Sequence, residues 1–155
     1  MGRTVASCRQ LALRARQHID QRRQRFDADL RQGQELTRAF VTACGTGDLN
    51  ALLALLSDDV VVWTDGGGKV RAALRPVVGR DRSSRFLLNV AKKLQGVLME
   101  TTLNGQPAMV FLAAAEVVAA VILDIREGKI VGVRTVTNPD KLERLSRQVG
   151  STPSD

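Results

Sequence analysis

The apolar positions of this chain change their spacing near residue 60. Before that point they recur every third or fourth residue, a spacing that predicts helices. Thr4 is the expected N-cap of a first helix, the polar segment 26–31 predicts a hinge, and Asp48 is the expected cap of a short third helix containing four leucines. The apolar stripes of the first two helices are Val5, Cys8, Ala12, Ala15 and Ile19, then Leu36, Phe40, Val41, Ala43 and Cys44.

From residue 60 onward the pattern favours strands. Residues 60–64 are β-branched and aromatic, and in such a strand Trp63 and Asp65 share one face. An extended segment is expected over 70–78, followed by a helix that Gly79 and Asp81 introduce and that carries Phe86, Leu87, Val90 and Leu94 on one side. Four more strands are predicted, and a final helix starts at Asn138-Pro139; the strands cover residues 97–103, 106–112, 117–125 and 129–137.

The cysteines and one long apolar stretch bear on the cellular compartment. Cys8 and Cys44 lie far apart, without the spacing of metal ligands, which fits two free thiols in a reduced cytoplasmic protein and no metal site. Residues 107–123 are almost long enough to cross a bilayer, but Glu116 lies in their middle, where a charge is costly. We therefore expect two buried strands joined near residues 114–116, and no membrane contact.

Most of the net charge lies at the N-terminus. The first 25 residues hold seven arginines and one acid, so they carry +6 of the chain's net charge of +7. Such a segment fits an interaction arm or a helix that faces nucleic acid, and it equally fits a solvated helical linker.

Two short motifs follow predicted strands. In Asp65-Gly66-Gly67-Gly68-Lys69 the spacing of a phosphate-binding loop is missing, so a sharp turn that another backbone can approach is the better interpretation. Asn138-Pro139-Asp140-Lys141-Leu142 has the chemistry of a helix start, with an asparagine cap, a proline in the first turn and an acid that the helix dipole favours. We expect the side chains of Asp140 and Lys141 to point outward.

Together with Leu-Asn-Gly-Gln-Pro-Ala at 103–108, the two motifs resemble the SnoaL-like C-terminal extension of bacterial extracytoplasmic-function sigma factors of the SigJ type. The resemblance covers residues 34–145. It implies a regulatory domain, not an enzyme, that modulates how the sigma factor engages RNA polymerase and promoter DNA in transcription initiation. The implied partners are the sigma core (regions two and four) and RNA polymerase, and the implied regulatory residues are Asp65, Gly66, Gly67, Gly68, Lys69, Asn138, Pro139, Asp140, Lys141 and Leu142.

The N-terminal segment 2–16 resembles the recognition helix that ends sigma region four. In the family that helix belongs to a helix-turn-helix that reads the promoter. The supporting helix of that unit and region two do not occur in this sequence, and a lone recognition helix lacks the scaffold that sets its angle in the groove. We therefore expect promoter contact only in a full-length factor. The DNA-facing residues that the resemblance implies are Arg3, Ser7, Arg9, Gln10 and Arg14.

Helices first, then a mostly antiparallel sheet with one embedded helix, indicate an α+β fold. This order resembles the cone-shaped nuclear-transport-factor-like (SnoaL-like) fold, in which a curved sheet wraps the helices and leaves a cavity. We expect a remnant of the region-four helix-turn-helix over 1–26, a linker over 27–33, the SnoaL-like domain over 34–148 and a disordered tail over 149–155.

The same cone also hosts enzymes, which leaves an alternative function: a small-molecule-binding domain or a polyketide-cyclase-like enzyme. Acid–base chemistry needs a positioned proton carrier, but the chain has no tyrosine and its one histidine, His18, lies in the first helix. No cofactor is expected; an unidentified ligand and a homodimer stay open. An open pocket in which Asp and Arg side chains converge would favour the alternative. The candidate pocket residues are Trp63, Phe86, Asn89, Asp124 and Arg134.

Overall fold

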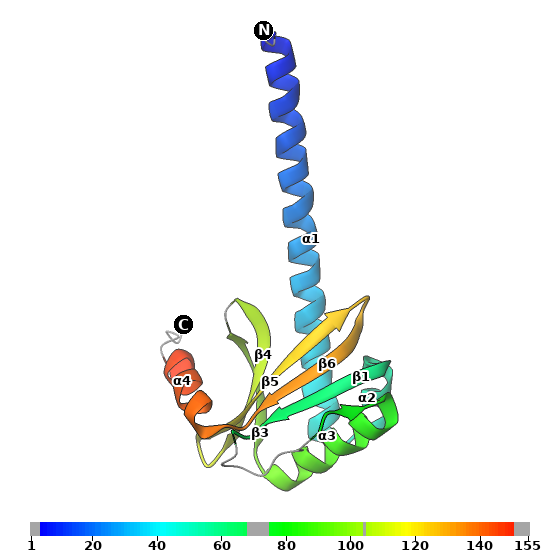
Figure 1. Cartoon of the computed structure of the whole chain (residues 1–155), viewed down its shortest axis with the longest axis vertical. Coiled ribbons are helices and arrows are strands. Elements are labelled where there is room, and N and C mark those ends of the chain that lie inside the picture. The colour runs from blue at the N-terminus through cyan, green and yellow to red at the C-terminus, as the bar shows by residue number, and fades with distance from the viewer. Residues whose placement is uncertain (1–3, 68–74, 104, 151–155) are drawn as a thin grey trace. The chain divides into compact units, whose positions relative to one another are not determined.

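A computed structural model of the chain describes residues 4–67, 75–103 and 105–150. They divide into two compact units, Met1–Gln32 and Gly33–Asp155. Figure 1 labels the helices and strands. The expected tail over 149–155 lies outside the described residues from residue 151 on.

Helix α1 spans Val5–Thr46. Thr4 caps it as expected, because its Oγ1 accepts a hydrogen bond from the Ser7 N–H at 3.2 Å. The hinge expected over 26–31 is wrong, since these residues continue the helix. The segment contains neither glycine nor proline, and a polar sequence of ordinary helix propensity remains helical without a buried face. In the second unit the buried face of α1 begins at Gly33 and continues through Thr37, Phe40 and Ala43.

A short helix and a long strand follow. Helix α2 spans Leu49–Leu55, and Asp48 caps it by accepting the Ala51 N–H at 3.0 Å, as expected. Strand β1 spans Leu56–Asp65 and is longer than the predicted 60–64, because its first residue, Leu56, pairs with Ile130 of another strand. The core-facing positions of β1 are Val60 and Val62, and Trp63 and Asp65 therefore share the opposite face, as predicted.

The segment predicted to be extended over 70–78 is a strand only in its last part. Strand β2 spans Val77–Val78, and residues 68–74 lie outside the described chain. Helix α3 spans Arg80–Leu94 and begins directly after Gly79, whose φ of 101° suits glycine. The helix predicted from the Phe86 stripe is therefore confirmed.

The sheet has six strands in the order β2-β1-β6-β5-β4-β3. Strands β3 to β6 span Val97–Leu103, Gln106–Ala113, Glu116–Arg126 and Lys129–Val136, close to the predicted bounds. These four form an antiparallel meander, whereas β6 pairs with β1 in parallel. Figure 1 shows β1 and β6 side by side with their arrowheads at the same edge. Helices with a mostly antiparallel sheet confirm the α+β prediction.

One face of the sheet packs against helices of the second unit. The core joins Phe40 of α1, Leu52 of α2 and Leu87 of α3 to Val62 and Val133 of the sheet. A fully buried side chain of this kind stabilises the fold by about 1.5–3 kcal/mol. The last helix, α4 (Pro139–Gly150), contacts β5 and buries Leu142.

The apolar stretch 107–123 forms strands β4 and β5, as predicted. Their connection is a tight turn in which Ala114 and Ala115 both have left-handed backbones, with φ of 51° and 64°. In the described part of the chain no helix is long and apolar enough to span a membrane.

The turn predicts a stabilising substitution. Ala115→Gly removes a left-handed backbone cost of about 1–2 kcal/mol, part of which the greater freedom of glycine in the unfolded chain cancels. We expect the free energy of unfolding in urea to rise by about 0.5–1 kcal/mol. Ala113→Gly, in strand β4 next to the turn, is the control and should destabilise, so equal effects of the two variants would contradict the strain interpretation.

Candidate functional site

The two sequence motifs meet at one edge of the sheet. Strands β1 and β6 run in parallel with Asp65 opposite Val136, so the residues that follow each strand emerge together. We call the resulting cluster the motif junction; it consists of Asp65, Gly66, Gly67, Thr137, Asn138 and Lys141.

The backbone carbonyl of Asp65 ties the two strand ends together. It accepts hydrogen bonds from the Thr137 N–H at 2.8 Å and from the Asn138 N–H at 3.0 Å. The Thr137 hydroxyl donates to the same oxygen at 3.3 Å. The chain is thus held to β1 while it passes from strand β6 into helix α4.

The Asp65 side chain joins the two motifs directly. Its Oδ1 accepts a hydrogen bond from the Gly67 N–H at 3.0 Å. Its Oδ2 accepts one from the Lys141 Nζ at 2.5 Å, although Asp65 and Lys141 are 76 positions apart in sequence. The hydrogen bond from Lys141, and after it the one from the Gly67 backbone, lowers the pKa of Asp65 below its ordinary value of 3.8. The expectation that the Lys141 side chain is left free is therefore wrong, because the lysine binds Asp65; it does lie at the surface, where both side chains remain partly exposed.

Asn138 has two roles in the motif junction. Its Oδ1 accepts the Asp140 N–H at 3.1 Å and caps α4, whose first residue is Pro139, as the sequence predicted. The same side chain packs against Gly67, where a Cβ atom would overlap the Asn138 amide. Gly67 also has a φ of 62°, so both space and backbone conformation favour glycine there. Gly68 and Lys69, the remaining residues of the first motif, lie outside the described residues.

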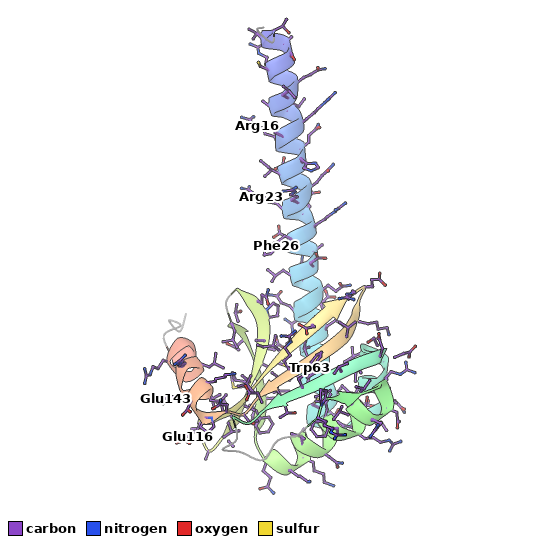
Figure 2. All side chains as sticks on the ribbon, viewed as in Figure 1. Arg16, Arg23, Phe26, Trp63, Glu116 and Glu143 are labelled. Atoms are coloured by element: carbon purple, nitrogen blue, oxygen red, sulfur yellow. The ribbon has the colours of Figure 1, made fainter. Side chains whose placement is uncertain are left out.

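Three of the five candidate pocket residues form a surface cluster instead. The guanidinium carbon of Arg134 lies 5.5 Å from the centre of the Trp63 ring, and Arg134 Nε donates to Asp124 Oδ2 at 3.1 Å. Gly132 makes room for this arrangement, since a Cβ there would come within 2.8 Å of Asp124 Oδ2. The cluster crosses β1, β6 and β5 on the face opposite the core, and Figure 2 labels Trp63 on β1.

A cavity of about 520 Å³ lies elsewhere, on the helix-covered face of the sheet. Of the remaining two candidates, Asn89 lines it, whereas Phe86 is half-buried and packs against the core. Trp63, Asp124 and Arg134 do not line it. The apolar residues that form most of its wall were predicted only as core positions, because the pattern of buried residues does not distinguish a filled core from a hollow one.

The residues expected to face DNA lie in the first unit. Arg9, Gln10 and Arg14 are exposed on α1, Ser7 is half-buried, and Arg3 lies outside the described residues. Further along the same helix, Figure 2 labels Arg16, Arg23 and Phe26, whose side chains project from the ribbon. Phe26 is 64% exposed, so this helix presents apolar as well as basic side chains.

The motif junction contains one residue that the sequence did not single out. Thr137 donates two hydrogen bonds to Asp65, yet a threonine at a strand end carries no distinctive signal. No group of three or more His, Cys, Asp or Glu residues that could hold a metal occurs in the ranges the structure describes.

Comparison with known proteins gives relatives for nearly the whole chain. No model of a known protein family matches it. A probable ECF RNA polymerase sigma factor SigI of Mycobacterium tuberculosis is 32% identical over 150 residues, which cover 97% of this chain and 50% of that protein. The ECF RNA polymerase sigma factor SigJ of the same organism is 28% identical, over 91% of this chain and 49% of its own length. The chain is a homologue of extracytoplasmic-function sigma factors. It spans about half the length of the curated relatives it matches.

Solved structures agree with this relationship and give the fold. The crystal structure of M. tuberculosis SigJ matches 89% of this chain and 50% of its own, with a TM-score of 0.61 and 25% identity. An NTF-2-like protein of unknown function from Burkholderia xenovorans matches 81% of this chain and 96% of its own, with a TM-score of 0.53 and 16% identity. The predicted nuclear-transport-factor-like, SnoaL-like fold is therefore confirmed.

The close approach at Gly67 predicts a position-specific loss of stability. Gly67→Ala should cost more than Gly47→Ala, although both glycines have left-handed backbones, because nothing lies within 4 Å of a Cβ at Gly47. The excess should be about 1 kcal/mol, the typical value of the N-cap that Asn138 would lose when displaced. Urea unfolding measures both costs. In an Asn138→Ala background the excess should vanish, and its persistence there would rule out the contact as its cause.

The lowered pKa of Asp65 predicts a pH dependence. A carboxyl group whose pKa is lower in the folded state contributes stability above its unfolded pKa and loses it as the pH falls through the folded value. The free energy of unfolding of the wild-type chain should therefore fall more steeply below pH 3.8 than that of Asp65→Asn. Urea unfolding at a series of pH values compares the two, and parallel profiles would show that the ion pair is not retained in solution.

Proposed function

We propose that residues 33–150 act as the regulatory domain of an extracytoplasmic-function sigma factor and that the motif junction is its contact with the sigma core or RNA polymerase. One observation carries the proposal: the two motifs, which are remote in sequence, converge on a single hydrogen-bonded cluster. This contact would modulate how the factor engages polymerase and promoter DNA.

The chemistry of the motif junction supports a contact role beyond folding. The Lys141 and Asp65 side chains are 57% and 41% exposed, and exposed ion pairs usually contribute little to stability. Their charges are nevertheless fixed in position by the strand ends and by the start of α4. A rigid pair of opposite charges at a sheet edge can select a partner with complementary charges.

The first unit fits the same proposal as the DNA-facing part of a longer factor. Its arginines give it a strong positive charge, which would neutralise phosphates, and its exposed apolar side chains, such as Leu13 and Ile19, would pack against a supporting helix. Promoter recognition is therefore proposed only for the full-length factor.

The polyketide-cyclase-like alternative gains little support from the cavity. Among its described lining residues there is no Asp, Glu, His or Tyr to carry a proton. Its one thiol, Cys44, has a pKa raised by burial to about 12, so it remains protonated and a poor nucleophile at neutral pH. The cavity is better suited to binding than to catalysis.

Transcription by the full-length factor tests the proposal. Asp65→Ala and Lys141→Gln should change output from its own promoter several-fold in a reconstituted assay with RNA polymerase, because each removes one of the paired charges. Arg85→Ala is the matched control, since it breaks an exposed ion pair with Asp81 on α3, away from the motif junction.

The thermal unfolding midpoint of each variant separates regulation from folding. The proposal predicts that output changes more in the two junction variants than their midpoints explain. If output merely tracks the midpoint across all three variants, the motif junction serves folding alone.

A further inference from the structure

The cavity has the size and lining of a binding site for a small molecule. Its volume of about 520 Å³ lies within the range of about 300–1,000 Å³ that is typical of small-molecule pockets. It lies between the C-terminal part of α1, the second half of α3 and the inner face of the meander. Its main apolar walls are Phe40, Cys44, Leu87, Leu88, Val90, Leu98, Phe111, Ala119 and Val121.

The polar groups of the cavity are few and unevenly charged. The hydroxyl-bearing Thr135 lines the sheet side, and Thr46, Asn89 and Lys92 line the helix side. The last three are exposed, so they form the rim where the cavity meets solvent. Lys92 is the only charged residue among the described lining residues, and an anionic group on an occupant would therefore find a single positive partner there.

Two buried hydroxyls lack hydrogen-bond partners in the described chain, those of Thr64 and Ser84; neither residue lines the cavity, but each has a neighbour that does. Thr64 is the register partner of Thr135 in the parallel pair β1–β6, and Ser84 lies one helical turn before Leu87 and Leu88, which line the cavity. Native proteins leave few buried hydroxyls unsatisfied, and a water molecule is one partner that such groups accept.

We propose that this cavity binds a small amphipathic acid, with its apolar body inside and its acidic group at Lys92. The cavity is large enough for the apolar part of such an acid, and the apolar wall removes that part from water. The positive charge of Lys92 at the rim favours an acid over an amine or a neutral molecule. The proposal rests on the cavity alone and does not depend on a contact at the motif junction.

Decanoate and 1-decanol serve as matched probes, because they share a ten-carbon chain and differ in charge at neutral pH. Their binding to the 155-residue chain is measured by displacement of the fluorescent dye 8-anilinonaphthalene-1-sulfonate, itself an apolar body with one anionic group. Lys92→Gln should weaken decanoate binding about tenfold, the effect of one lost charge-assisted hydrogen bond, and leave decanol binding unchanged. Lys93→Gln is the control, since Lys93 is an exposed neighbour that does not line the cavity.

The location of binding is tested separately. Decanoate should shift the amide resonances of Ala119, Val121 and Thr135, and Ala119→Trp, which fills the cavity, should abolish binding of both probes. If Ala119→Trp does not fold, the resonance shifts in the wild-type chain decide the location. Shifts confined to the exposed apolar residues of unit Met1–Gln32 would overturn the site.

Two further results would overturn the proposal. Failure of decanoate to bind at all excludes an amphipathic acid as the occupant. Equal effects of Lys92→Gln and Lys93→Gln on decanoate would show that the acidic group is not recognised at the rim. Neither result bears on transcription by the motif-junction variants, so the two proposals fail independently.

Discussion

The parallel pairing of β1 with β6 places Asp65 opposite Val136, and most of the functional geometry depends on it. Strands β3 to β6 follow one another through short turns, but β1 and β6 are separated in sequence by β2, α3 and the rest of the meander. Parallel strands cannot be joined by a tight hairpin and end at the same edge of a sheet. The pairing therefore brings the two sequence motifs together. It also holds Thr135, which lines the cavity, next to β1.

The antiparallel part of the fold could be predicted because its signals are local. Strands β3 to β6 are rich in apolar residues and are separated by short turns, so their bounds follow closely from the sequence. The pairing of β1 with β6 has no such signal, since no residue in either strand encodes the other's position in the sheet. The hinge expected over 26–31 does not form, because the segment is polar but lacks the glycine or proline that would break a helix.

The candidate site was predictable in its parts and not in its assembly. The cap at Asn138 and the turn at Gly67 follow from residue chemistry at one position each. The hydrogen bond between Lys141 and Asp65 depends on the parallel pairing of β1 with β6, so it could not be predicted from the sequence. Polar and aromatic residue types do not mark the cavity, because Trp63, Asp124 and Arg134 interact with one another on the outer face. The cavity is lined mostly by apolar side chains.

Thr135 lies in β6 and lines the cavity, whereas Thr137 directly follows β6 and is hydrogen-bonded to Asp65. A displacement of the end of β6 would therefore change the geometry at both places. Thermodynamic linkage then requires reciprocity: an occupant that favours one position of this strand end strengthens a partner that favours the same position, and that partner strengthens the occupant by the same factor. If the cavity has an occupant and the motif junction a partner, the end of β6 is the stretch of backbone through which each would influence the other.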